Sequence, residues 1–114
     1  MITIEKLAAY GADTKAGLGR CLNNEAFYLR LVGKEMEDPN FARLQEAMAA
    51  GDMKAAFEAA HALKGALGNL ALTPIFEPVS ELTELLRGAE GSVETGDLLD
   101  RAMEAYASLK QLAE

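Results

Sequence analysis

The residues best suited to chemistry are His61, Lys64, Gly65 and Gly68, which lie within one short stretch of the chain. His61 is the only histidine in the sequence. If the stretch is one helix, these spacings place all four residues on the same side of it. A glycine inside a helix costs about 0.5–1 kcal/mol relative to alanine, so a function should require both glycines. An imidazole nucleophile that a bulky partner must approach would require them.

The helix expected over residues 53–71 has a core side and an open side. At about 100° per residue, its core side is formed by five apolar residues, Ala56, Ala60, Leu63, Leu67 and Leu70. His61 lies roughly opposite this stripe. The residues that share its direction are Lys54, Gly65, Gly68 and Leu72. We therefore expect His61 to face solvent, with Gly65 and Gly68 leaving open space around the ring.

Lys64 indicates which group the imidazole could carry. Its ammonium lies one turn from His61 and can reach an anion bound to the ring. Neutral imidazole is a good nucleophile near pH 7, so a phosphoryl group is the main candidate. The sequence has no Gly-rich phosphate loop, so we expect the chain not to bind ATP by itself.

Other site chemistries find little support in the sequence. One histidine, one distant cysteine (Cys21) and a nearby cation do not make a metal site. Ser–His or Cys–His catalysis would need an orienting acid and an oxyanion site that are not apparent. A lone cysteine excludes an internal disulfide and suits a reducing cytoplasm, and we expect Cys21 to be packed in the core. We expect neither a metal nor a cofactor.

Length and composition predict one all-α domain spanning residues 1–114. Half of the residues are apolar and a quarter are charged, which is typical of a globular chain. Helix-forming alanine, leucine and glutamate are plentiful, while β-branched residues are sparse. The caps expected are Asp13, Asn24, Asp38, Asp52 and Thr73, the last followed by Pro74. The helices expected cover residues 3–10, 14–22, 25–37, 39–50, 53–71, 74–87 and 97–112.

Only residues 88–96 have the pattern of a long loop. The other connections are short, which predicts an antiparallel up-and-down four-helix bundle with short accessory helices at the N-terminal end. The net charge of −7 argues against binding nucleic acid or an anionic membrane. No apolar run approaches the roughly 20 residues that span a bilayer, and no secretory signal is visible. We expect a cytoplasmic protein.

The segment His61-Ala62-Leu63-Lys64-Gly65, followed by Gly68-Asn69-Leu70, resembles the signature of histidine-containing phosphotransfer (HPt) domains. Residues 19–29 resemble the start of that family's first long helix, and residues 80–86 resemble the helix beside the histidine helix. Ala66 and Ala71 depart from the family pattern, where a serine and a glycine are frequent. Both are small residues, so these departures concern the fine tuning of the site and not the transfer itself.

The resemblance implies a role for each residue. His61 would accept and donate the phosphoryl group, Lys64 would lie beside it, and Gly65 would leave space for it. Gly68 and Asn69 would have secondary roles in docking. Phe57 and Leu72 would extend the docking surface, although the Phe57 ring is better explained as a wedge against the adjacent helix.

The resemblance also implies the partners, which are receiver domains of response regulators or of a hybrid histidine kinase. The receiver would supply the aspartate and Mg²⁺, so the chain would be a phosphoryl carrier in two-component signalling and not an enzyme. We expect a monomer. The alternative left open is a helical adaptor that binds a partner without phosphoryl chemistry. A dimerisation module is a third reading, to which the exposed glycines give little support.

Overall fold

The computed structural model describes residues 1–91 and 93–114, and this part of the chain is helical throughout. It contains seven helices and no strand. They are α1 (Ile4–Tyr10), α2 (Thr14–Arg20), α3 (Glu25–Glu35), α4 (Asn40–Ala50), α5 (Met53–Asn69), α6 (Thr73–Leu86) and α7 (Leu98–Gln111). The prediction of an all-α fold is confirmed. Within these residues, no helix is long and apolar enough to cross a membrane.

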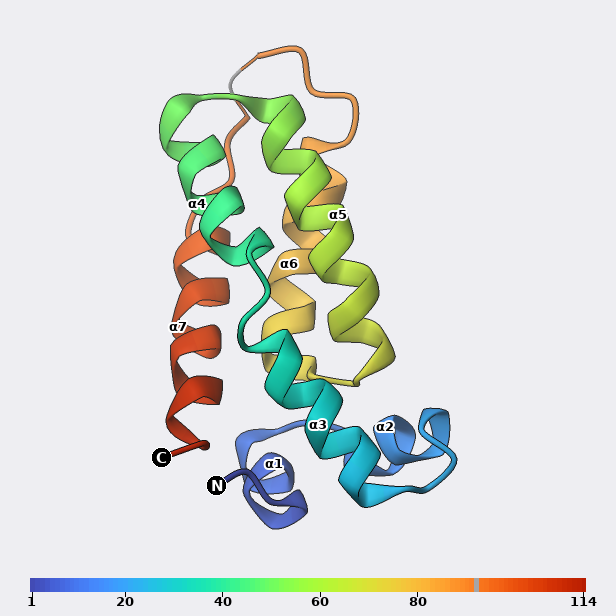
Figure 1. Cartoon of the computed structure of the whole chain (residues 1–114). Coiled ribbons are helices and arrows are strands. Elements are labelled where there is room, and N and C mark those ends of the chain that lie inside the picture. The colour runs from blue at the N-terminus through green and yellow to red at the C-terminus, as the bar shows by residue number, and fades with distance from the viewer. Residues whose placement is uncertain (92) are drawn as a thin grey trace.

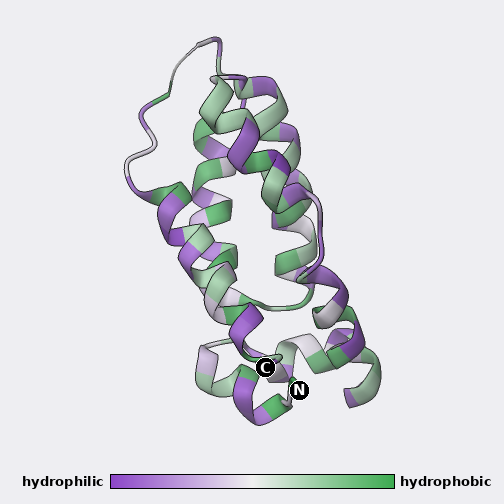
Figure 2. Ribbon diagram, turned by 60° about the vertical axis from the view of Figure 1, so that its left-hand side comes forward, coloured by the Kyte–Doolittle hydropathy of each residue, from purple (hydrophilic) through white to green (hydrophobic). Residues whose placement is uncertain are grey.

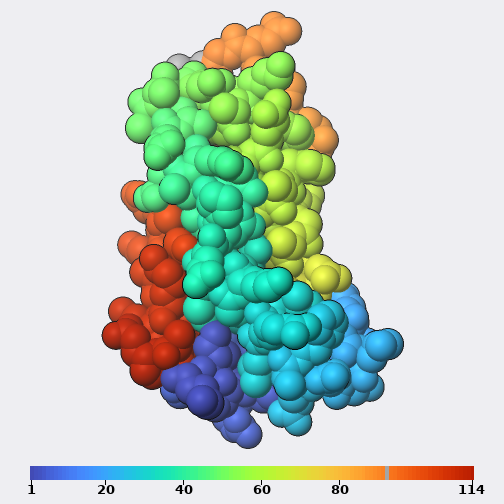
Figure 3. Space-filling view, viewed as in Figure 1, coloured from blue at the N-terminus to red at the C-terminus, as the bar shows by residue number. Residues whose placement is uncertain are grey.

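The four helices α4 to α7 lie side by side along the length of the molecule, while α1 and α2 cover one end (Figure 1). Helix α5 packs against α4 and α6, and α6 packs against α7. Hydrophobic and hydrophilic residues alternate along these helices, as expected when each buries only one side (Figure 2). Helix α5 therefore keeps an outward surface, which is visible beside α4 in the space-filling view (Figure 3).

Four helices begin at a side-chain cap. Three of these caps, Asp13, Asn24 and Asp52, are the residues that the sequence predicts, and the fourth is Thr3. Thr3, Asp13, Asn24 and Asp52 each accept a hydrogen bond at 3.1 Å from the backbone N–H three residues later. Such a bond satisfies one of the free N–H groups of a first turn. Pro39 is the cap residue of α4, so the prediction of Asp38 as its cap was wrong by one position. Asp38 still accepts a hydrogen bond from the Asn40 N–H at 2.9 Å, one residue further out.

The end of α5 differs from the prediction, and the difference moves Leu72. The helix ends at Asn69 because Ala71 adopts a left-handed φ of +56°. The Leu72 N–H then donates to the Leu67 carbonyl at 3.0 Å, a closing pattern common at helix ends. Leu72 no longer follows the rotation of α5 and is 0% exposed. Thr73 is the first residue of α6, so its prediction as a cap was wrong by one position.

The core is the one that helical periodicity predicts. Ala56, Ala60, Leu63, Leu67 and Leu70 are all buried. Cys21 is 2% exposed, so its predicted packing role is confirmed. The described residues of the predicted loop 88–96 are non-helical, and Ser92 lies outside the described residues.

The N-terminal helices close the C-terminal end of α5. The Tyr28 hydroxyl donates to the Leu70 carbonyl at 2.8 Å. Gly17 is required beside this ring, because a Cβ on it would lie 2.5 Å from Tyr28 Cε1. Arg20 Nη1 donates to the carbonyls of Gly68 at 2.8 Å and Asn69 at 3.3 Å. The last carbonyls of α5 are thus satisfied from α2, which fixes this end of the helix.

Candidate functional site

His61 lies in the middle of α5, and its side chain is exposed, as predicted. Its neighbours on the helix, Ala60 and Leu63, are buried and anchor the opposite side of α5 in the core. Because the helix is packed in this way, the backbone of His61 is held in place while its ring remains accessible. This arrangement suits a nucleophile that a large partner must reach.

Phe57 lies one turn before His61, and its ring lies beside the imidazole. The two rings are stacked, with centroids 5.5 Å apart and planes 14° apart. Phe57 is partly buried against the core, and the guanidinium carbon of Arg87 lies 5.1 Å from its ring centroid. The ring therefore contacts the imidazole on its own helix and the guanidinium of Arg87, the residue that follows α6. A wedge of this ring against the adjacent helix stays a prediction.

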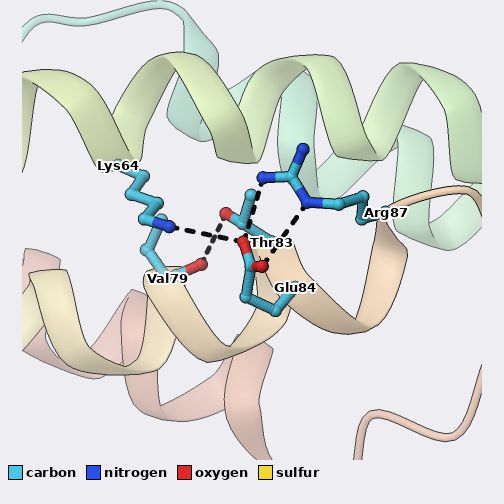
Figure 4. A network of polar contacts seen from close by, with 5 residues as sticks. All are labelled: Lys64, Val79, Thr83, Glu84 and Arg87. Atoms are coloured by element: carbon cyan, nitrogen blue, oxygen red, sulfur yellow. Dashed lines mark hydrogen bonds and ion pairs between the residues drawn. The ribbon is translucent and has the colours of Figure 1, made fainter.

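Lys64 lies one turn after His61 and is held by an acidic residue of α6. Its Nζ lies 3.3 Å from Glu84 Oε2. The same carboxylate accepts from Arg87, at 3.0 Å from Nη2 and 3.4 Å from Nε (Figure 4). Hydrogen bonds from Arg87 and then from Lys64 lower the pKa of Glu84, so the carboxylate is ionised at neutral pH.

A buried hydroxyl lies directly behind this ion-pair network. Thr83 is buried in α6, and its Oγ1 donates to the Val79 carbonyl at 2.7 Å (Figure 4). This bond satisfies the hydroxyl within its own helix, as threonine commonly does. Glu84, the next residue, therefore lies on the outer side of α6, facing Lys64 of α5.

The two glycines of α5 have different roles. A Cβ built on Gly65 would meet no atom within 4 Å apart from the local helix backbone, so Gly65 opens onto solvent as predicted. A Cβ on Gly68 would lie 3.0 Å from Cε1 of Phe76 on α6. The prediction of open space at Gly68 was wrong, because this glycine allows a close approach by a neighbouring helix.

The two remaining predicted docking residues, Asn69 and Leu72, differ in exposure. Asn69 is exposed at the last position of α5, beside Gly68. Leu72 is fully buried, so its prediction as a docking residue was wrong. The cause is that α5 ends at Asn69, so that Leu72 no longer follows the rotation of the helix. Sequence reasoning missed Glu84 and Arg87. Their spacing of three residues places them on one face of a helix, but nothing in that spacing indicates Lys64 as a neighbour.

The described part of the chain contains no cluster of three or more histidine, cysteine, aspartate or glutamate side chains that could hold a metal ion. The ion-pair network of Lys64 instead joins two cations, Lys64 and Arg87, to one carboxylate, Glu84. Such a set can neutralise a bound anion.

The site has the features of a helical carrier with one accessible imidazole, and the comparison with protein families agrees. The family model of the Hpt domain matches residues 29–113, so this chain belongs to the Hpt domain family. This family implies histidine phosphotransfer in two-component phosphorelays, and its members are phosphocarriers rather than enzymes. Searches of curated proteins and of solved structures gave no match. Helices α1 and α2 precede the matched residues.

Proposed function

We propose that His61 accepts a phosphoryl group from the aspartate of a receiver domain and donates it to another receiver. The single observation that carries this proposal is the exposed imidazole at the middle of α5, with Lys64 one turn away, in a chain of the Hpt family. The partners proposed are receiver domains of response regulators or of a hybrid histidine kinase.

The transfer needs little from this chain beyond a positioned nucleophile. The electron pair of the unprotonated ring nitrogen forms the N–P bond, while the P–O bond of the aspartyl phosphate breaks. The electron pair of that bond returns to the aspartate carboxylate, and the reverse reaction regenerates free His61. Positioning and charge neutralisation dominate such transfers, and the receiver contributes Mg²⁺ on its own side.

Three residues of α5 support the step in different ways. Phe57 holds the plane of the imidazole through its stacked ring. Lys64 is the cation nearest along the helix, and it would neutralise part of the charge on the bound phosphoryl group. Gly65 would leave room for the group and for the receiver's active-site loops. Gly68 and Asn69 would lie at the edge of the docking surface.

We also propose the finer features of the fold and setting that the family resemblance implies. Helices α4 to α7 would form the antiparallel up-and-down four-helix bundle, with α1 and α2 as accessory helices. Residues 1–114 would act as a single domain and a monomer. A cytoplasmic setting, where receivers are found, stays a prediction.

The test is transfer from a receiver charged with acetyl phosphate and Mg²⁺, followed by detection of phosphohistidine. The wild-type chain should take up label, and His61→Gln should take up none. Lys54→Gln is a matched control, because Lys54 is exposed on the same helix two turns earlier. Binding of receivers without label in the wild type would support the adaptor reading instead.

A further inference from the structure

Lys64 already has an anionic partner before any phosphoryl group arrives. Its ammonium is paired with the Glu84 carboxylate, and that carboxylate is also bound by Arg87. The side chains of Lys64, Glu84 and Arg87 are 31%, 54% and 52% exposed, so all three are in contact with water. A phosphoryl group on His61 would therefore compete with Glu84 for Lys64.

We propose that Glu84 is the resting counter-ion of Lys64, which holds the ammonium while His61 is free and releases it when His61 is phosphorylated. This inference rests on the proposed function. Glu84 is a positioning residue in this account, since it acts through Lys64.

The exchange is feasible because the pair is exposed. An ion pair in contact with water is weakly held, and an ammonium has three donors that rotate freely about a flexible stem. A phosphoryl group offers more negative charge and more acceptor oxygens than a carboxylate. Lys64 should therefore prefer the phosphoryl group when both are within reach.

Arg87 keeps the released carboxylate near the site. It donates two hydrogen bonds to Glu84, and its guanidinium also lies over the Phe57 ring, which stacks on His61. Glu84 would thus stay paired with Arg87 after Lys64 has moved, and its negative charge would oppose the charge on the phosphoryl group. The phosphoryl group would therefore be held less firmly on His61 and transferred more readily.

The experiment compares Glu84→Gln with the wild type. Glutamine keeps the length of the side chain and can still accept from Arg87, but it lacks the charge. Asp97→Asn is the matched control, because it removes one negative charge from an exposed pair at the start of α7, in which Asp97 Oδ1 lies 4.0 Å from Arg101 Nη1.

Two measurements are needed for each protein. The first is the equilibrium distribution of the phosphoryl group between a receiver and the chain. We expect Glu84→Gln to shift it about two- to fivefold toward the chain, the range expected when a competing exposed ion pair is removed. The second is the ¹⁵N resonance of Lys64 Nζ, which should move on phosphorylation of the wild type as its partner changes. Asp97→Asn should match the wild type in both.

The inference is overturned if Glu84→Gln leaves the distribution unchanged, shifts it toward the receiver, or shifts it no more than Asp97→Asn does. It is also overturned if the Lys64 resonance of the wild type does not respond to phosphorylation. These failures leave labelling of His61 intact. Failure of the proposed function is different, because the wild-type chain would then take up no label at all.

Discussion

Glu35 makes the stability of this protein dependent on pH. It is the last residue of α3, is 8% exposed, and has a buried Oε2 without a hydrogen-bond partner in the described structure. Burial raises the pKa of this carboxyl to about 8, helped by hydrogen bonding to, and repulsion from, the Asp38 carboxyl. Glu35 is therefore mostly protonated at pH 7 in the folded protein.

The size of the effect follows from proton linkage. An ordinary glutamate has a pKa of 4.5, against about 8 in the fold. Between these values the folded state binds one proton more than the unfolded state, so the free energy of unfolding falls as pH rises. Each pH unit costs about 1.4 kcal/mol, which amounts to about 3 kcal/mol by pH 7.

The perturbation is Glu35→Gln, which keeps the shape of the side chain and does not ionise. Its amide can also donate to Asp38. We expect the variant to match the wild type near pH 4.5 and to exceed it by about 3 kcal/mol in free energy of unfolding at pH 7. Urea unfolding followed by circular dichroism at several pH values between 4.5 and 8 measures this difference.

Glu37→Gln is the control, because Glu37 is exposed and lies two residues away. It makes the same glutamate-to-glutamine change on an exposed side chain of the same segment, and its free energy of unfolding should stay within about 0.5 kcal/mol of the wild type at each pH. A difference between Glu35→Gln and the wild type that stays constant from pH 4.5 to 8 would refute the reasoning. Destabilisation by Glu35→Gln at pH 7 would refute it as well.

Two further predictions concern α5. Lys64→Ala should slow transfer from a phosphorylated receiver by about tenfold without abolishing it, because the change removes one charge-assisted contact and not the nucleophile. Rapid-quench kinetics measure the rate of transfer, and an unchanged rate would contradict the prediction. Gly65→Ala should raise the free energy of unfolding by about 0.5–1 kcal/mol, because its Cβ meets open space, while slowing transfer by crowding the site. Urea unfolding and the same kinetics test it, and a faster or unchanged transfer would show that Gly65 gives no clearance.

Much of the helical architecture was readable from the sequence because local rules decide it. Asp13, Asn24 and Asp52 cap helices as their residue types indicate. The apolar stripe of residues 53–71 is the buried side of α5, and this alone places His61 in solvent. Periodicity succeeds here because one long helix fixes the direction of every side chain along it.

The wrong predictions concern residues whose surroundings depend on the end of a helix or on a neighbouring helix. The direction of Leu72 was extrapolated past the end of α5, and the left-handed Ala71 breaks that extrapolation. Gly68 was interpreted without knowledge of which side chain faces it, and only the packing of α6 brings Phe76 there. Lys64 meets Glu84 for the same kind of reason, since the register between two packed helices depends on the whole core.

The most direct test of the central claim is to locate the phosphoryl group after transfer. The wild-type chain would be incubated with a phosphorylated receiver, separated from it, digested and mapped by mass spectrometry under alkaline conditions, which preserve phosphohistidine. The account predicts one phosphoryl group, on His61, which is lost in acid. A phosphoryl group on any other residue, or equal labelling of His61→Gln, would contradict it.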